Sequence, residues 1–168
     1  LLFRSAVETG KRARSETTIS RGTASISHAA VEMATEVVGE LAGKRVAVIG
    51  AGSMGEGVAV ALHKAGGSEI LVVNRSPERG ASLAARVSGR TVGMGHLTDA
   101  VATADVIVAS TGSGEPIITT ELVRNARLGC GADQPLHIFD IAMPRDVEVG
   151  VADLAGVTVF NLDDLRDW

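Results

Sequence analysis

The segment from Lys44 to Gly57, KRVAVIGAGSMGEG, limits the possible folds of this chain more than any other stretch. Its apolar run, Val46 to Ile49, is typical of a short strand that is buried on both faces. Glycines follow the run at the spacing G-x-G-x-x-G, and a helical pattern of apolar residues follows the glycines. A strand, a glycine turn and a helix in this order predict a dinucleotide-binding segment, rather than a purely structural glycine turn.

Each of the three glycines has its own expected task. Gly50 permits the tight turn out of the strand, Gly52 lets the backbone approach a pyrophosphate, and Gly55 lets the helix pack closely on the strand. The free N–H groups and the positive dipole end at the start of the helix favour negative phosphates. We therefore expect cofactor contacts along the whole loop, from Gly50, Ala51, Gly52, Ser53, Met54 and Gly55.

Beyond the glycines, strand-like and helical patterns alternate. Apolar runs predict further strands at residues 70–73, 91–94, 105–110, 136–140 and 157–160. Helical patterns lie between them, at about residues 76–87, 97–104 and 121–126. Such alternation indicates a parallel sheet with right-handed crossovers. The predicted fold class is α/β, a Rossmann-type doubly wound parallel sheet with helices on both faces.

Composition narrows the function classes. With 168 residues, of which 45% are hydrophobic, the chain can form a domain with a real core. A net charge of −4 argues against a general nucleic-acid-binding surface. A single cysteine excludes an internal disulfide framework and fits a reducing cytosol, so we expect a cytoplasmic protein. No apolar run approaches the roughly 20 residues of a membrane helix, so no membrane association is expected.

The end of the second predicted strand bears on the choice of cofactor. NAD-binding domains carry an Asp or Glu here, which holds the ribose 2′-hydroxyl. In this chain Asn74 lies near that position, 19 residues after Gly55, and Arg75 and Ser76 follow it. A carboxylate would repel a 2′-phosphate, whereas Arg75 can bind one with paired charge-assisted hydrogen bonds. We therefore favour NADP over NAD. A plain turn, or an adenine-nucleotide site without redox use, remain alternatives.

Later strand ends are expected to flank the rest of the cofactor, because ligands bind outside the carboxyl ends of the strands. Ser110, Thr111 and Gly112 follow the fourth predicted strand and are candidates for contacts with the ribose or the nicotinamide. The alternative for them is a polar turn.

The loop after the fifth predicted strand is a second candidate wall. Ala142 and Met143 follow that strand and are candidates to line the nicotinamide, with ordinary core packing as the alternative for Met143. Asp140 has the simpler alternative of accepting hydrogen bonds from backbone N–H groups.

Catalytic machinery is not evident. Cys130 lies between glycines, and no sequence feature supplies it with a base, so we interpret it as a bystander. The histidines are scattered, and no metal-ligand cluster is present in the sequence. We therefore predict no catalytic residue and no metal site.

The N-terminal part differs in character from the rest. Residues 1–10 have the pattern of the end of a helix, stopped by Gly10, and residues 1–24 carry five basic and two acidic side chains. A solvated linker is the first interpretation of this basic stretch, and a contact with an anionic partner is the second. Ser27 is a candidate N-cap for a helix that runs to about Leu41 and ends at Gly43. The chain starts with Leu1 rather than Met, and we interpret it as a piece of a longer protein.

Several stretches together resemble the nucleotide-binding domain of the glutamyl-tRNA reductase family. They are GAGSMG from Gly50, NRS from Asn74, STG from Ser110, DIAMPRD from Asp140, and the leading stretches GKRARSET and SISHAAVE. The resemblance covers nearly the whole chain. The IAMPRD stretch and the leading segment are the specific signals, although Met143 stands where Val is more usual. The closing NLDDL resembles the start of the family's C-terminal dimerisation helix.

The resemblance implies NADPH-dependent reduction of a glutamyl thioester, formed from glutamyl-tRNA, to glutamate-1-semialdehyde for tetrapyrrole (porphyrin) synthesis. The nucleophilic cysteine and the tRNA contacts would belong to an N-terminal catalytic domain. The implied division is residues 1–24 as the tail of that domain, 25–42 as a linker helix, 43–160 as the NADP-binding domain and 161–168 as the start of the dimerisation helix. The full-length protein would be a homodimer, and this chain alone monomeric and inactive.

Two alternatives remain open. A shikimate-dehydrogenase-like NADP oxidoreductase shares the Asn-Arg-Ser/Thr signature, but it needs a catalytic Lys–Asp pair, which this sequence does not show. A nucleotide-sensing Rossmann module would bind nucleotide without preferring the reduced, phosphorylated form.

Overall fold

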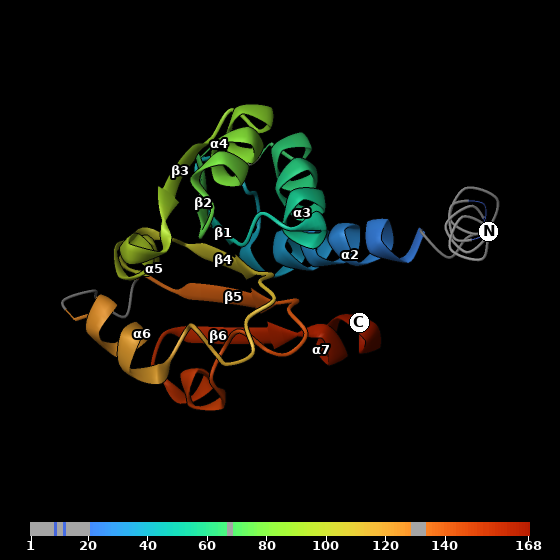
Figure 1. Cartoon of the computed structure of the whole chain (residues 1–168). Helices are drawn as coiled ribbons and strands as arrows, with labels where there is room; N and C mark the ends of the chain where they lie inside the picture. Colours follow the sequence, from blue (N-terminus) through green and yellow to red (C-terminus); the bar gives the residue numbers. More distant parts are fainter. Residues whose placement is uncertain (1–8, 10–11, 13–20, 67–68, 129–133) are drawn as a thin grey trace.

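A single parallel sheet dominates the computed structural model, which describes residues 9, 12, 21–66, 69–128 and 134–168 (Figure 1). Its strand order is β3-β2-β1-β4-β5-β6, and every neighbouring pair is parallel. The strands are β1 (Arg45–Ile49), β2 (Glu69–Asn74), β3 (Arg90–Gly93), β4 (Val106–Ala109), β5 (Leu136–Asp140) and β6 (Val157–Asn161). The predicted doubly wound α/β sheet is confirmed.

The strand order reverses at the centre of the sheet. From β1 the chain steps outward to β2 and β3, and it then returns to place β4 on the other side of β1. The connections that leave β1 and β4 therefore diverge and open a crevice at the carboxyl ends of these strands. The loop that carries Gly50, Gly52 and Gly55 thus lies at the edge of the sheet where this crevice opens.

Helices cover both faces of the sheet. They are α2 (Arg21–Val38), α3 (Ser53–Lys64), α4 (Pro77–Arg86), α5 (Leu97–Thr103), α6 (Thr120–Ala126) and α7 (Leu162–Asp167), with short 3-10 turns at η2 (Met94–His96) and η3 (Val149–Asp153). Side chains alternate along β1, so Val46 and Val48 pack with α2, α3 and α4 while Ala47 and Ile49 pack with α5 and α6. A strand between two helical layers has to be apolar on both faces, which explains the unbroken run VAVI.

The bounds of α2 differ from the prediction. Ser27 is not its N-cap, because the helix already begins at Arg21, and the helix ends at Val38 rather than near Leu41. Gly39 terminates it with φ 81° and an N–H bond to the Thr35 carbonyl. Ser27 is buried, and a Cβ on Gly57 would lie 2.6 Å from its Oγ. Ser27 therefore serves as a small residue where α2 and α3 cross, which periodicity within one helix does not reveal.

Other predicted elements agree with the structure to within about two residues. Ser76 caps α4 by accepting a hydrogen bond from the Arg79 N–H at 3.3 Å, and Pro77 occupies the first turn, as predicted. Asn161 and Asp164 form a reciprocal capping box at the start of α7, which lies beside α2 (Figure 1). The predicted helix over residues 1–10, apart from Thr9, lies outside the described residues, and so does Cys130.

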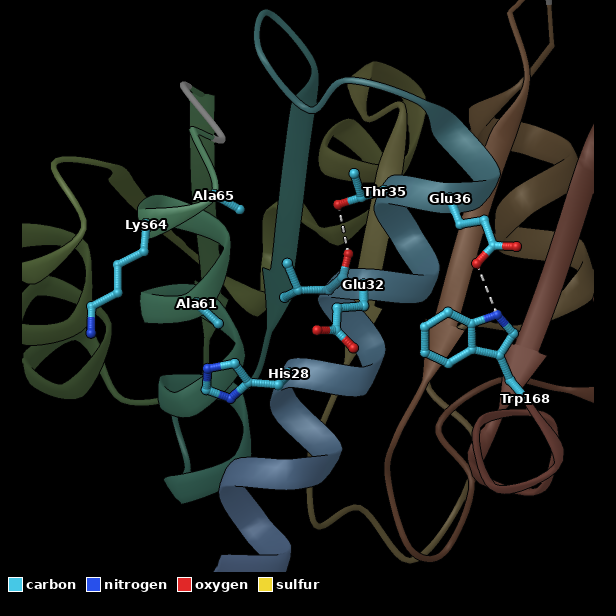
Figure 2. Close-up of a pocket in the computed structure, with 9 residues that line it drawn as sticks. His28, Glu32, Thr35, Glu36, Ala61, Lys64, Ala65 and Trp168 are labelled. Atoms are coloured by element: carbon cyan, nitrogen blue, oxygen red, sulfur yellow. Dashed lines mark hydrogen bonds between the residues drawn. The ribbon is translucent and has the colours of Figure 1, made fainter.

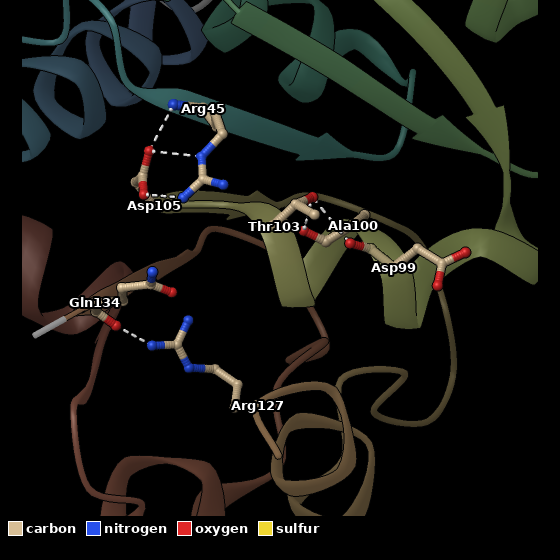
Figure 3. Close-up of polar contacts among 7 residues, drawn as sticks. All are labelled: Arg45, Asp99, Ala100, Thr103, Asp105, Arg127 and Gln134. Atoms are coloured by element: carbon tan, nitrogen blue, oxygen red, sulfur yellow. Dashed lines mark hydrogen bonds and ion pairs between the residues drawn. The ribbon is translucent and has the colours of Figure 1, made fainter. Parts of the chain in front are cut away.

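An ion pair joins two strands at the opposite, amino end of the sheet. Arg45 donates to Asp105 from its backbone N–H and from Nη2, each at 2.8 Å (Figure 3). Burial alone would raise the pKa of Asp105, but the Arg45 hydrogen bonds and charge bring that pKa below its usual value. This contact holds β1 against β4 well away from the crevice.

His137, on β5, gives the fold an expected pH dependence. Its Nδ1 is buried and has no hydrogen-bond partner among the described residues. Burial, and then the charge of Lys44, lower the pKa of His137 below 6.5. The unfolded chain therefore binds a proton more readily than the folded chain, and stability should fall as the pH drops below about 6.5. Urea denaturation between pH 5.5 and 7.5 measures this slope.

His137→Thr should flatten the slope, because it removes the depressed group and keeps a residue suited to a strand. His63→Gln, at the exposed end of α3, is the control variant and is measured alongside it. An unchanged slope in His137→Thr would contradict the assignment to His137.

Candidate functional site

A cleft with a volume of about 470 Å³ lies at the carboxyl ends of β1, β2 and β4. Three loops that are distant in sequence form it. Its lining residues are Gly50, Ala51, Gly52, Asn74, Arg75, Ser76, Arg79, Ser110, Gly112 and Ser113. The structure thus brings together most of the residues that the sequence singles out, and it adds Arg79 and Ser113.

Gly50 and Gly55 shape the loop through its fit against the protein itself. Gly50 has φ 101°, and a Cβ there would lie 2.8 Å from the Ser110 carbonyl oxygen. A Cβ on Gly55 would collide with the Gly50 carbonyl group and with Ser110 Oγ. A side chain at Gly50 would press against the loop after β4, and a side chain at Gly55 would push α3 off the end of β1. The turn task predicted for Gly50 and the packing task predicted for Gly55 are therefore confirmed.

Gly52 is different from the other two glycines. A Cβ built on it would meet no atom within 4 Å, although Gly52 lines the cleft. The missing side chain therefore leaves space in the cleft rather than space for the protein to pack. Gly52 is the N-cap of α3, and it has no side chain that could accept a hydrogen bond from the N–H groups of Met54 and Gly55 in the first helical turn. Such N–H groups at the start of a helix attract anions.

The Asn74 side chain joins two of the loops that form the cleft. Its Oδ1 accepts a hydrogen bond from the Ala51 N–H at 2.9 Å, and its Nδ2 donates to the Ser76 carbonyl at 2.9 Å. The side chain thus links the glycine loop to the loop after β2. The sequence predicts Asn74 as a cofactor contact, whereas the structure shows its amide engaged with the protein. Its effect on a ligand would be to fix the distance between the two loops.

Two arginines stand on the β2 side of the cleft. Arg75 follows Asn74 directly, Arg79 lies in the first turn of α4, and both residues line the cleft. Both residues are exposed. Arg79 also lines an adjoining hollow of about 340 Å³ together with Ser53 and Arg86. Sequence reasoning missed Arg79, although its place in the first turn of the helix that Ser76 caps, directly after β2, is a signal that could have revealed it.

On the other side of the cleft, hydroxyl groups are held by the protein. Ser110 Oγ donates to the Ile49 carbonyl at 3.1 Å. Thr111 donates to the buried Asp146 carboxylate from its backbone N–H, at 2.6 Å, and also from its Oγ1. Burial raises the pKa of Asp146, the Thr111 hydrogen bonds oppose that rise, and the Asp140 charge adds to it. The predicted hydroxyls of Ser110 and Thr111 are thus engaged with the protein. The backbone groups of Gly112 and Ser113 are the ones left to face the cleft.

The loop after β5 is organised by Asp140. Its carboxylate accepts hydrogen bonds from the N–H groups of Ala142 at 3.1 Å and Val147 at 3.0 Å, so its predicted alternative role as a backbone acceptor is confirmed. Ala142 is buried, whereas Met143 is 81% exposed, which rules out core packing for Met143. Neither residue lines the cleft, and their contact with a nicotinamide stays a prediction.

A second hollow, of about 560 Å³, lies among α2, α3 and α7 and shares no residue with the cleft (Figure 2). At its rim Trp168 Nε1 donates to the Glu36 carboxylate at 3.1 Å. Glu32 stands on the same side, and Lys64 stands on the α3 side. Within the described part of the chain, no group of three or more His, Cys, Asp or Glu side chains could hold a metal ion. Nor is any helix of this part long and apolar enough to cross a membrane.

Comparisons with known proteins agree with this geometry. The family model described as Shikimate / quinate 5-dehydrogenase matches residues 32–168. Glutamyl-tRNA reductase of Methanopyrus kandleri is 45% identical over 166 residues, and that of Bacillus subtilis is 41% identical over 166 residues. These alignments cover 99% and 98% of this chain but 41% and 36% of the relatives, so the chain spans about two fifths of their length.

Solved structures support the same grouping. The Methanopyrus kandleri glutamyl-tRNA reductase superposes with a TM-score of 0.79 over 98% of this chain and 41% of that one. Shikimate 5-dehydrogenase from Listeria monocytogenes, solved with shikimate and NAD, superposes with a TM-score of 0.61 over 85% of this chain and 54% of that one. At 17% identity, that second match shows the fold alone. The resemblance to glutamyl-tRNA reductases is thereby confirmed, and the chain belongs to the Shikimate / quinate 5-dehydrogenase family.

Proposed function

We propose that this chain is the NADPH-binding domain of a glutamyl-tRNA reductase. The full-length enzyme would reduce a glutamyl thioester to glutamate-1-semialdehyde in tetrapyrrole synthesis. One observation carries the proposal. The cleft at the switch point of the sheet joins an open Gly52 to two arginines, and no carboxylate is among the described residues that line it. When bound there, NADPH supplies the hydride.

The residues of the cleft fit a dinucleotide. The empty side of Gly52 and the N–H groups at the start of α3 suit a pyrophosphate. Arg75 and Arg79 suit a 2′-phosphate, because guanidinium groups bind phosphates with paired charge-assisted hydrogen bonds. Gly112 and Ser113 offer backbone groups to the nicotinamide half of the dinucleotide. These features support NADPH over NADH, since the part of the lining that the structure describes holds no carboxylate for a free ribose 2′-hydroxyl.

A shikimate-dehydrogenase-like oxidoreductase is the second candidate, and the description of the matching family model favours it. Against it stand 45% identity with a glutamyl-tRNA reductase and 17% with the shikimate 5-dehydrogenase from Listeria. The residues that precede this chain in the longer protein distinguish the two. A cysteine-bearing domain there favours the reductase, and a substrate domain with a Lys–Asp pair favours the dehydrogenase. A domain with neither feature would favour the nucleotide-sensing module.

Several further statements belong to the same proposal. Residues 1–24 would be the tail of a catalytic domain that binds glutamyl-tRNA, 25–42 a linker, 43–160 the cofactor domain and 161–168 the start of a dimerisation helix. The full-length protein would be a cytoplasmic homodimer. We expect this chain alone to be monomeric, because the six residues of α7 make a helix of only about 9 Å, too short to hold two chains together.

The experiment that tests the proposal compares this chain with the full-length protein. The chain should bind NADPH in a fluorescence titration but should not oxidise it with glutamyl-tRNA, because hydride transfer needs an acyl carbon held at roughly 3–3.5 Å from the nicotinamide. The full-length protein should oxidise NADPH, and Cys130→Ser in it should leave the rate nearly unchanged. Turnover by this chain alone, lost in Cys130→Ser, would contradict the domain assignment.

A further inference from the structure

Asp146 is a fully buried carboxylate behind the cleft, and it lines neither the cleft nor the adjoining hollow. It lies on the loop after β5, yet its side chain reaches the loop after β4. There it accepts the Thr111 N–H on Oδ2 at 2.6 Å and the Thr111 hydroxyl on Oδ1. Both oxygens of the carboxylate are thus directed at one residue, 35 positions earlier in the chain.

The contact continues from Thr111 to the wall of the cleft. The Ser113 N–H donates to Thr111 Oγ1 at 3.2 Å, while that hydroxyl donates its own proton to Asp146. Gly112, between these two residues, lines the cleft together with Ser113. Asp146 therefore fixes the segment from Thr111 to Ser113 through the two donors of Thr111 and the hydrogen bond from Ser113 to Thr111.

Asp140 already supplies the structural support of the β5 loop. Its carboxylate takes the N–H groups of Ala142, Asp146 and Val147, so the loop that carries Asp146 is held without the Asp146 side chain. What the Asp146 side chain adds is the link to the β4 loop. A buried carboxylate is costly unless it is hydrogen-bonded, and here the only described side-chain partners are the two donors of Thr111.

We propose that Asp146 is a positioning residue for the nicotinamide half of the cofactor, acting through Thr111 on the Thr111–Ser113 wall. This inference rests on the proposed binding of NADPH. The adenosine half belongs on the β2 side with Arg75 and Arg79, and β4 lies on the opposite side of β1. Loosening the Thr111–Ser113 wall should therefore weaken the binding of the nicotinamide half of NADPH and leave the binding of the adenosine half unchanged.

Two ligands separate these halves. NADPH spans the whole cleft, whereas adenosine 2′,5′-bisphosphate carries only the adenosine, the 2′-phosphate and one 5′-phosphate. Thr111→Val removes the hydroxyl at nearly constant volume. Calorimetry should show that it lowers the affinity for NADPH about five-fold. Asp146→Ala, which removes both acceptors, should weaken NADPH by about ten-fold or more. Adenosine 2′,5′-bisphosphate should bind both variants within about two-fold of the unmodified chain.

Asp146→Asn tests positioning against charge. Its amide can keep one acceptor for the Thr111 N–H and can donate to Thr111 Oγ1, whose own proton is free to rotate. NADPH affinity should therefore return to within about two-fold of the unmodified chain. Thr103→Val is the matched control, because Thr103 Oγ1 bonds the Asp99 carbonyl at 2.9 Å on α5, near the amino end of the sheet (Figure 3). It should leave both ligands unaffected.

The outcomes are distinguishable. Equal losses for NADPH and for adenosine 2′,5′-bisphosphate would overturn the inference, since they would indicate general damage to the cleft. Unchanged NADPH affinity in Thr111→Val would also overturn it, and so would an Asp146→Asn variant as weak as Asp146→Ala. If Asp146→Ala does not fold, Thr111→Val and Asp146→Asn decide the question alone. Failure of the unmodified chain to bind NADPH would instead refute the proposed function, and this inference with it.

Discussion

Gly52→Val is expected to abolish NADPH binding and to leave the fold intact. Gly52 has φ −83° and ψ −179°, an extended conformation that valine adopts readily, and a Cβ there meets no protein atom within 4 Å. The new side chain would therefore occupy only the space that we assign to the pyrophosphate. Losing the N–H contacts of a charged phosphate, at about 1.5–3 kcal/mol each, should weaken binding by about a hundred-fold or more.

Fluorescence titration with NADPH measures the binding, and urea denaturation measures the fold. Valine substitutions at two other glycines serve as controls. Gly55→Val should destabilise the chain strongly, because its Cβ would collide with the Gly50 carbonyl group. Gly93→Val should affect neither property, because its Cβ meets no atom within 4 Å and Gly93 does not line the cleft. Normal NADPH binding by Gly52→Val would show that the phosphates are held elsewhere.

The second large effect is expected from the two arginines. Arg75→Ala should weaken NADPH roughly ten- to a hundred-fold, since a charge-assisted hydrogen bond contributes about 1.5–3 kcal/mol. Combining it with Arg79→Ala should weaken NADPH further, because both guanidinium groups line the same side of the cleft. NADH affinity should change little in either variant, since NADH has no 2′-phosphate.

Calorimetry with both cofactors tests this difference. Arg124→Ala is the matched control, an exposed arginine of α6 that does not line the cleft, and it should change neither affinity. Repeating the titrations at higher salt should reduce the difference in affinity between NADPH and NADH, because salt screens the charges of exposed arginines. Equal losses of NADPH and NADH in Arg75→Ala would rule out a 2′-phosphate contact.

Strand positions and the architecture could be predicted because they depend on patterns that are short in sequence. The run VAVI has to be buried on both faces, and the G-x-G-x-x-G spacing that follows it requires a turn and a close helix. The cap at Ser76 and the proline after it likewise define the start of α4 without tertiary information. The bounds of the helix at residues 21–38 were harder to predict. Its N-terminal bound does not follow from a local cap, and Ser27 is determined by the crossing of α3.

Within the cleft, the sequence identified the loops better than the tasks of their side chains. Asn74, Ser110 and Thr111 are polar residues at strand ends, which is where ligand contacts are expected. All three turn their side chains to the protein instead. A polar group can satisfy its hydrogen bonds on either a ligand or the protein, and composition does not distinguish the two.

The sequence by itself therefore determined the strands and helices of the α/β fold, the glycine loop after β1 and the absence of an acidic residue at position 74, because each depends on residues close together in the chain. Only the tertiary structure decided that Asn74 joins two loops, that Arg79 shares the cleft with Arg75, and that Asp146 holds Thr111. Asn74 reaches Ala51 across 23 residues and Asp146 reaches Thr111 across 35, and the parallel sheet is what brings those strand ends to one edge.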